Sequence, residues 1–227
     1  MEDPFGLLIV DKAKGMTSHD VVDLVRRKFR IKKVGHAGTL DPGATGVLVL
    51  LVGKATKLSG DFLNQDKEYV ATMRLGEKTD TGDSAGKIIE AREIRVSEKE
   101  IKDVMEGFLG ESYQVPPMVS AKKVNGKRLY KIARKGIEIE RQPKKIFIKE
   151  IETISVELPC VKFRVICSKG TYIRQLAEDA GEKLGCGAHL TELERTRSGP
   201  FLLEQAIPVS TLVDMDQHTL NESIIRI

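Results

Sequence analysis

The sequence predicts a mixed α+β fold, and three observations support this prediction. Short apolar runs typical of strands and amphipathic stretches typical of helices both occur along the 227 residues. The two kinds of stretch do not alternate regularly, as they would in a doubly wound parallel sheet. The sequence contains no internal repeat, and no low-complexity linker separates these stretches. A chain of this length can bury one sizeable core, or one core with a small appendage.

The strands are predicted from apolar runs and from alternation. Residues 7–10 (LLIV) form a short apolar run, and residues 47–52 form an unbroken one that Gly53 closes. Residues 67–75 (KEYVATMRL) alternate like a half-buried strand. Two more strands are expected around residues 146–156 and 161–167.

The first helix is predicted between the strands at residues 7–10 and 47–52. Thr17 or Ser18 caps its start, and it continues to about Phe29. Its apolar side chains and Lys28 recur at helical spacing, and its other face is basic. The sequence therefore predicts an amphipathic helix with a basic outer face.

Two further helices have recognisable ends. Ser97 and Glu100 form a capping box that opens a helix, and Gly110 is expected to end it. The stretch from Thr171 to Leu184 carries apolar residues at helical spacing.

Composition excludes several classes of protein. No run of about 18 apolar residues is present, so no membrane span is expected. The N-terminus has an acid where a signal peptide would carry a basic residue. Three cysteines without a C-x-x-C pair fit reduced thiols and a cytoplasmic location.

The net charge of +4 is small, but the charges are clustered. Residues 121–150 contain eleven Lys or Arg against three Glu. A second basic cluster comprises Arg26, Arg27, Lys28, Arg30, Lys32 and Lys33. Clusters of this kind predict a surface that contacts a polyanion, and the alternative is a solvated charged face.

No metal site is predicted. The four histidines are scattered, and no H-E-x-x-H motif occurs. Cys186 and His189 lie three residues apart but lack a second pair of ligands. The segment TDTGDSAG (residues 79–86) superficially resembles a calcium loop but lacks two of the required oxygen ligands.

Asp41 is the first candidate for chemistry. It lies in the segment VGHAGTLDPGATG, where glycines and a proline surround a single carboxylate. Glycine on both sides allows a ligand to approach the backbone closely. The alternative is an Asx-type turn that leads into a strand.

Arg174 is the second candidate. With Thr171 as N-cap, it would occupy the third helical position, where a cation opposes the helix dipole. A carboxylate or phosphate opposite the guanidinium would offset this cost, and Asp41 is the candidate partner. Gly170 and Tyr172 beside it would let a planar ligand approach and stack. The alternative is a solvated surface arginine.

Tyr69 is the third candidate. The chain has four Tyr and no Trp, so surfaces for aromatic stacking are scarce. A lone Tyr on a strand usually packs in a core. In a basic cleft that faces RNA, it would serve as a platform for base stacking.

Six segments together resemble the TruB-type tRNA pseudouridine synthases, in order and over nearly the whole chain. They are LLIVDKAKGMTSHDVV, KVGHAGTLDPGATGVL, GKATKLS, DKEYVATMRLGEKTDTGDSAG, QVPPMVSAKKVNGKRLYKIARKG and CSKGTYIRQLAEDAGEKLGCGAHLTELERTRSGPF. The resemblance implies a mixed, largely antiparallel sheet flanked by helices, with an active-site cleft across the sheet. It also implies that a uridine in the T loop of tRNA is isomerised to pseudouridine, without a cofactor or metal.

The resemblance also implies roles for individual residues. Asp41 corresponds to the catalytic carboxylate, and Arg174 to the arginine that forms a salt bridge with it. The residues implied to contact or line the site of the flipped nucleotide are His36, Tyr69, Tyr172 and Leu193, with Lys12 and Lys14 matched by motif alone. The candidates for RNA-backbone contacts in the most basic stretch are Lys122, Lys123, Lys127 and Arg128.

The predicted organisation is a single catalytic domain over residues 1–227, with a small inserted subdomain near residues 75–115. Many members of the family continue into a C-terminal PUA module, whereas this chain stops at Ile227, either as a short member or as a truncated one. The expected partner is the tRNA T arm, and the expected state is a monomer in the cytoplasm. Two alternatives remain, a guide-RNA-dependent (dyskerin-type) synthase and a catalytically inactive RNA-binding or tRNA-folding module.

Overall fold

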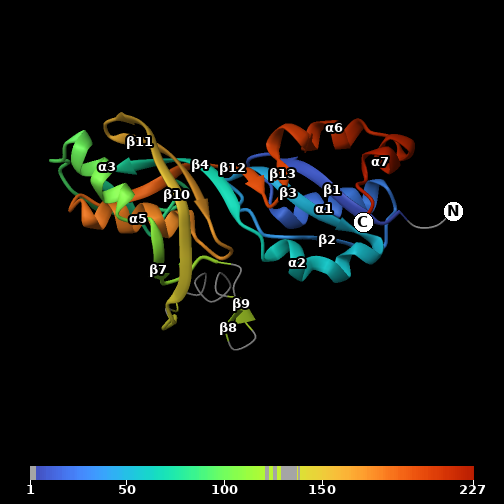
Figure 1. The fold of residues 1–227 in the computed structure, drawn as a ribbon, viewed down its shortest axis with the longest axis horizontal. Helices are drawn as coiled ribbons and strands as arrows, with labels where there is room; N and C mark the ends of the chain where they lie inside the picture. Colours follow the sequence, from blue (N-terminus) through green and yellow to red (C-terminus); the bar gives the residue numbers. More distant parts are fainter. Residues whose placement is uncertain (1–3, 121–122, 125–126, 129–136, 138) are drawn as a thin grey trace. The chain divides into compact units, whose positions relative to one another are not determined.

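The computed structural model describes residues 4–227 except 121–122, 125–126, 129–136 and 138. The chain divides into two compact units, residues 1–69 with 193–227, and residues 70–192. It passes from one unit to the other within strands β4 (Lys67–Leu75) and β12 (Ala188–Ser198), both visible in Figure 1.

The first unit is built on the long antiparallel pair β1 and β3, which aligns Gly6 with Val52 and Lys12 with Gly46. The strand order is β14-β1-β3-β12, with β2 beside β3 and β13 beside β12. The pairs β1–β14 and β3–β12 are parallel. The elements are β1 (Gly6–Lys12), α1 (Ser18–Lys28), β2 (Val34–His36), β3 (Thr45–Val52), η1 (Gly53–Leu58), α2 (Ser59–Leu63), β13 (Phe201–Leu202), η2 (Leu203–Gln205), β14 (Ile207–Pro208), α6 (Val209–Asp214) and α7 (Gln217–Ser223).

Both faces of β1 and β3 are buried. Alternate residues such as Leu8 and Leu48 face a core formed with α1, α6 and α7. Their neighbours, such as Ile9 and Val49, join a second cluster that includes Ala55 of η1. Burial on two faces requires apolar residues at successive positions, which explains the unbroken run. The strands predicted at residues 7–10 and 47–52 are confirmed.

Helix α1 begins where the sequence predicts. Thr17 is the N-cap, and its side chain and that of Asp20 cap each other's backbone N–H groups. The helix ends at Lys28, with Phe29 as C-cap. The assignment of Lys28 to the apolar stripe is wrong, because its ammonium is exposed and donates to the carbonyl of Val213.

The second unit carries the strand order β4-β11-β10-β7, in which β10 pairs antiparallel with both β11 and β7. It contains β5 (Glu77–Thr79), β6 (Ile88–Ala91), α3 (Glu98–Glu106), β7 (Gly110–Gln114), β8 (Lys123–Val124), β9 (Lys127–Arg128), β10 (Lys144–Glu157), β11 (Cys160–Cys167) and α5 (Ile173–Lys183). The predicted α+β class, with mixed, largely antiparallel pairing and flanking helices, is confirmed.

Two helix boundaries in this unit differ from the prediction. The capping box of Ser97 and Glu100 is present, but α3 stops before Gly107 because that glycine is already its C-cap. Gly110, expected to end the helix, instead begins β7 with a φ of 90°. At the other helix, Tyr172 rather than Thr171 is the N-cap, which places Arg174 at the second helical position.

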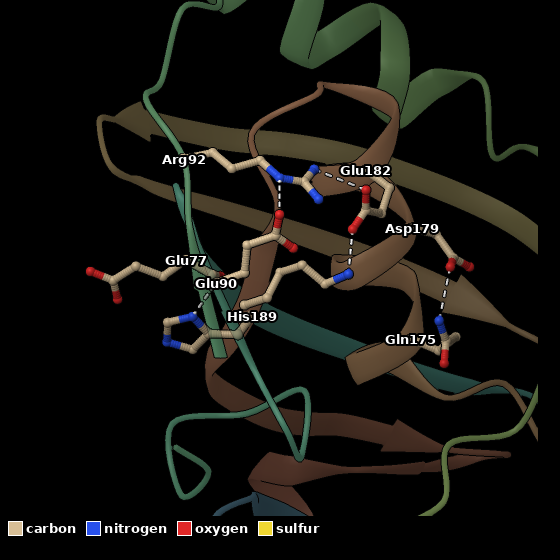
Figure 2. Close-up of polar contacts among 8 residues, drawn as sticks. Glu77, Glu90, Arg92, Gln175, Asp179, Glu182 and His189 are labelled. Carbon is tan, nitrogen blue, oxygen red and sulfur yellow. Dashed lines mark hydrogen bonds and ion pairs between the residues drawn. The ribbon is translucent and has the colours of Figure 1, made fainter. Parts of the chain in front are cut away.

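Ion pairs tie the β5–β6 hairpin to α5 in the second unit (Figure 2). Glu182 of α5 accepts a hydrogen bond from Arg92 at 3.0 Å and another from Lys78 of β5. Nδ1 of His189 lies 3.1 Å from the carbonyl of Glu77. The ion pairs hold the open end of the hairpin beside the C-terminal end of α5.

Strand β12 was missed in the sequence. Its segment AHLTELERTRS carries four charged residues, Glu192, Glu194, Arg195 and Arg197. These interrupt the apolar alternation that marks a half-buried strand. Arg195 nevertheless lies on it with a side chain only 1% exposed. Because a buried arginine is not apolar, a pattern that looks for apolar residues on the buried face of a strand does not detect this one.

Candidate active site

The loop that carries Asp41 is a tight turn between β2 and β3. The N–H of Ala44 donates to the backbone carbonyl of Asp41 at 3.0 Å, which closes a backbone β-turn over residues 41–44, and the Asx-type turn of the alternative interpretation stays a prediction. Pro42 and Gly43 at its tip are exposed, and Asp41 is half-buried. The turn thus holds a carboxylate beside an accessible loop tip.

The segment around the start of α1 holds this loop at two points. The hydroxyl of Ser18 accepts from the N–H of Leu40 at 2.8 Å and donates to its carbonyl at 3.2 Å. The N–H of Gly15 donates to the carbonyl of Pro42 at 2.8 Å. The residues immediately before and after Asp41 are therefore both anchored.

Arg195 supports the two ends of the same loop. Its Nε donates to the carbonyl of Val47 at 2.7 Å, and its Nη2 donates to that of Gly38 at 3.1 Å. Gly46 allows this arrangement, because its φ is 98° and a side chain there would collide with the backbone of Arg195. Sequence reasoning missed Arg195, and its only signal was a charged residue in a segment that proves to be a strand.

Lys12 lies fully buried beneath the loop. Its ammonium donates to the carbonyls of Ala13 and Met16 at 2.9 and 2.7 Å, and that of Pro42 lies 3.4 Å away. Burial lowers the pKa of Lys12 to about 8, and the negative charge of Asp41 opposes the shift. Lys12 was predicted as a substrate contact, whereas in the structure its ammonium binds the carbonyls of this loop and of its own turn.

The other candidates of the first unit lie near the same core. Tyr69 and Leu193 are partly buried and pack against the core cluster that contains α1. His36 is half-buried at the end of β2, five residues before Asp41. Lys14 is exposed. Tyr69 therefore has the packing role of the alternative interpretation, and a stacking role for its ring stays a prediction.

In the second unit, Arg174 is buried rather than solvated, with 3% of its surface exposed. Its guanidinium donates to the carbonyls of Thr81 and Val119 at 3.0 and 2.8 Å. Its Nε lies 3.8 Å from the carboxylate of Asp83. The interpretation of Arg174 as a solvated arginine is wrong, and its pairing with Asp41, a residue of the other unit, stays a prediction.

Asp83 is a residue that sequence reasoning overlooked. One carboxylate oxygen accepts from the hydroxyl of Thr81 at 2.6 Å and from the N–H of Ala85 at 3.1 Å. These bonds fold the TDTGDSAG segment into a loop and direct the other oxygen toward Arg174. The signal that could have indicated Asp83 was the density of turn-forming residues in this segment. The segment was compared only with a calcium loop, which it resembles superficially.

Tyr172 is held by its backbone. Its N–H donates to the side-chain oxygen of Gln114 at 2.8 Å, and its carbonyl accepts from the side-chain nitrogen of Gln114 at 3.1 Å. The paired bonds fix the N-cap residue of α5, two positions before Arg174.

Other predicted features are placed only in part. Lys122 lies outside the described residues, and for Lys123, Lys127 and Arg128 the structure gives only the backbone of β8 and β9. Among the described residues, no group of three or more His, Cys, Asp or Glu is arranged to hold a metal ion. No helix in the described part of the chain is long and apolar enough to cross a membrane.

Curated proteins with similar sequences share one description. The tRNA pseudouridine synthase B of Burkholderia pseudomallei (strain 668) is 49% identical over 207 residues, which are 91% of this chain and 68% of that protein. The protein of the same name from Protochlamydia amoebophila (strain UWE25) is 49% identical over 219 residues, 95% of this chain and 83% of that protein.

Solved structures also resemble the chain. A Cbf5–Nop10–Gar1 complex contains a chain that is 34% identical with a TM-score of 0.78. An H/ACA RNP bound to a substrate RNA with 2′-deoxyuridine contains one that is 32% identical with a TM-score of 0.72. The present chain spans 60% and 59% of their lengths, and they cover 98% of it in both comparisons.

Two family models divide the sequence between them. The model of the N-terminal domain of TruB family pseudouridylate synthases matches residues 26–173. The model of the tRNA pseudouridylate synthase B C-terminal domain matches residues 174–226. The chain therefore belongs to the TruB family of pseudouridylate synthases.

Proposed function

We propose that this protein isomerises a uridine in the T loop of tRNA (position 55) to pseudouridine, with Asp41 as the catalytic carboxylate. The family and the names of the curated relatives support the reaction and the RNA class. The observation that carries the role of Asp41 is its loop, which Ser18, Gly15 and Arg195 hold from several sides.

The reaction suits a single well-placed carboxylate. The N-glycosidic bond of the uridine breaks, the uracil turns, and a carbon–carbon bond to the ribose replaces the bond that was lost. Atoms and electrons balance within the nucleotide, so the reaction as written consumes no oxidant, reductant or nucleoside triphosphate. A carboxylate can serve it as a nucleophile or as a base.

Arg174 and Tyr69 would complete the site. A guanidinium close to Asp41 would keep the carboxylate ionised and oriented, through the attraction of opposite charges. The uridine must leave its stack before it can react, which costs a few kcal/mol. Stacking on the ring of Tyr69 would offset part of that cost. His36, Tyr172 and Leu193 are proposed to line the nucleotide site, with Lys12 beneath the loop and Lys14 at its surface.

The proposed partner is the tRNA T arm, bound by a monomer in the cytoplasm. Lys122, Lys123, Lys127 and Arg128 are proposed to contact its phosphates, because they belong to the most basic stretch of the chain. Two alternatives remain. A guide-dependent synthase would need a second RNA, and an RNA-binding module would not need Asp41.

The test uses a T-arm transcript, without cofactor or guide RNA, and Asp41→Asn as the variant. Wild-type protein should form pseudouridine and the variant none, while the affinity for the transcript holds or rises because a negative charge is lost. Asp61→Asn is the matched control, since Asp61 is an exposed acid of the same unit.

Each outcome separates the candidates. Pseudouridine that appears only when a guide RNA is added supports the guide-dependent enzyme. Tight binding without product under every condition supports the binding module. Turnover by Asp41→Asn, free of wild-type protein, would remove Asp41 from the catalytic role.

A further inference from the structure

We propose that a basic groove along α1 and the residues that follow it binds backbone phosphates of the substrate RNA. This inference rests on the proposed function. The groove has a volume of about 560 Å³ and is called the α1 groove below. It is lined by His19, Asp23, Arg26, Arg27, Arg30, Ile31 and Lys32.

The charges of the α1 groove are strongly unbalanced. Four cations line it against one carboxylate, Asp23, which lies 3.4 Å from Arg26 and 3.8 Å from His19. The side chains of Arg27, Arg30 and Lys32 are exposed, and no ion pair joins them to another described residue. An anion is the ligand that such a surface favours.

The helix dipole explains only part of this cluster. Basic residues in the last turn of a helix stabilise it, which accounts for Arg26 and Arg27. Arg30 and Lys32 lie beyond the end of the helix, where the dipole gives no such reason. Their position across the same groove indicates a ligand that spans both segments.

The backbone of Arg30 supplies an independent observation. Its φ is 54°, and it is the only residue other than glycine with a positive φ in the described part of the chain. It follows the C-cap of α1, a position that glycine usually occupies because a side chain there is strained. Strained backbone of this kind clusters at functional sites, and the side chain of Arg30 lines the groove.

The α1 groove belongs to the same rigid framework as the Asp41 loop. At the start of α1, Ser18 binds Leu40, and the groove runs from His19 in the same turn along this helix of roughly 16 Å to Lys32 beyond its end. The chain then runs from Lys32 through Lys33 into β2, and the carbonyl of Lys33 accepts from the N–H of Gly53. A phosphate held in the groove would therefore hold the RNA at a set distance from Asp41.

The first experiment removes charge without touching the helix cap or the Arg26–Asp23 pair. Arg27→Gln with Lys32→Gln is compared with Lys54→Gln with Lys57→Gln, two exposed lysines of the same unit. Each lost phosphate contact should lower the affinity for a T-arm transcript about five- to eightfold at 0.1 M salt. The double variant should therefore bind about 25- to 60-fold more weakly, with a flatter salt dependence, and the control should bind like wild type.

The second experiment separates binding from folding. Arg30→Gly relieves the strained backbone, so the melting temperature should rise by about 2–4 °C. The same variant should bind the transcript about five- to eightfold more weakly at 0.1 M salt. A residue with a purely structural role cannot produce a more stable protein that binds less RNA.

The outcomes also distinguish this inference from the proposed function. Unchanged affinity and salt dependence in the groove variants would overturn the proposal that the α1 groove binds RNA, even where wild-type protein makes pseudouridine. Weaker binding by the groove variants, with normal single-turnover rates at saturating RNA, supports it. Where wild-type protein makes no pseudouridine but the groove variants still lose affinity, the proposed function fails and the groove stands as an RNA-binding surface. An acidic protein as the true occupant would leave transcript binding unchanged and so would count against the inference.

Discussion

The hydroxyl of Ser18 and the peptide of Leu40 form two hydrogen bonds with each other, at 2.8 and 3.2 Å. The pair joins the first turn of α1 to the residue immediately before Asp41. Ser18 is only 2% exposed, so water cannot replace these bonds easily. The position of the Asp41 loop thus depends on a residue 23 positions away in sequence.

We expect Ser18→Ala to loosen the Asp41 loop. The substitution leaves the buried N–H and carbonyl of Leu40 without their partner, at a cost of about 1–3 kcal/mol in unfolding free energy. Displacement of the carboxylate should lower kcat roughly tenfold to a hundredfold, with a smaller change in KM. Denaturant unfolding and single-turnover kinetics measure the two effects. Ser223→Ala is the control, since the hydroxyl of Ser223 makes a local bond within α7, to the carbonyl of Thr219. A normal kcat in Ser18→Ala would show that the loop does not need this anchor.

We expect Tyr69→Phe and Tyr69→Ala to differ in their effects on RNA binding. Phe keeps the ring, so RNA binding should persist while a later proton-handling step slows. Ala also loses stacking, which is worth about 1–3 kcal/mol per base. Binding constants and product formation are measured alongside stability, because Tyr69 packs against the core and Ala will destabilise the protein. Tyr113→Ala is the control, at a tyrosine that is 71% exposed. Equal activity of Phe and Ala at position 69 would leave Tyr69 a packing residue only.

We expect Arg174→Lys to damage turnover much more than binding. One ammonium cannot reproduce the planar fork that reaches the carbonyls of Thr81 and Val119 beside the carboxylate of Asp83. Turnover should fall roughly a hundredfold, while transcript affinity stays within about threefold. Asp83→Asn should produce a milder form of the same defect. Single-turnover rates and binding constants of both variants test this prediction.

Arg95→Lys is the control for Arg174→Lys, because the side chain of Arg95 is 80% exposed and its ion pair among the described residues is with the exposed Glu93. Equal losses of turnover and binding in Arg174→Lys would assign Arg174 to general folding of the second unit.

We expect the contribution of Lys12 to stability to depend on pH. Burial lowers the pKa of the folded state to about 8, below the ordinary value of 10.5. Between these values the unfolded chain binds more protons than the folded one, so the stability of the wild type rises with pH across this window, by at most about 3 kcal/mol. Below pH 8 both states are protonated, and the full cost of the buried charge is present.

The test compares Lys12→Met with wild type in urea at pH 7, 8, 9 and 10. The stability difference, wild type minus variant, should become more favourable to wild type as pH rises. Lys54→Met, at an exposed lysine, should show no such trend. A flat difference for Lys12→Met would mean that the buried ammonium keeps its ordinary pKa.

Much of the fold could be read from the sequence because the signals were local. The capping box at Thr17, the strand at residues 67–75 and the run at residues 47–52 each follow from side chains next to one another. Asp41 and Arg174 were also recognisable from the sequence. Asp41 is a single carboxylate among glycines, and Arg174 is a cation in the first turn of a helix, where the dipole favours an anion. The six motifs then identified the family.

The tertiary structure alone decided which residues support the site. Arg195 lies in a segment where no strand was predicted, and Ser18 and Asp83 lie where a local pattern predicts a helix cap and a turn. The hydrogen bonds of Ser18 and Arg195 join segments 22 to 157 residues apart, and the ion pair of Asp83 with Arg174 joins positions 91 residues apart. The fold brings those segments together by packing apolar faces elsewhere. The tertiary structure likewise decided that the ammonium of Lys12 is buried against backbone carbonyls. A sequence pattern records which side chains can form hydrogen bonds, whereas only the packed chain determines which backbone carbonyls they reach.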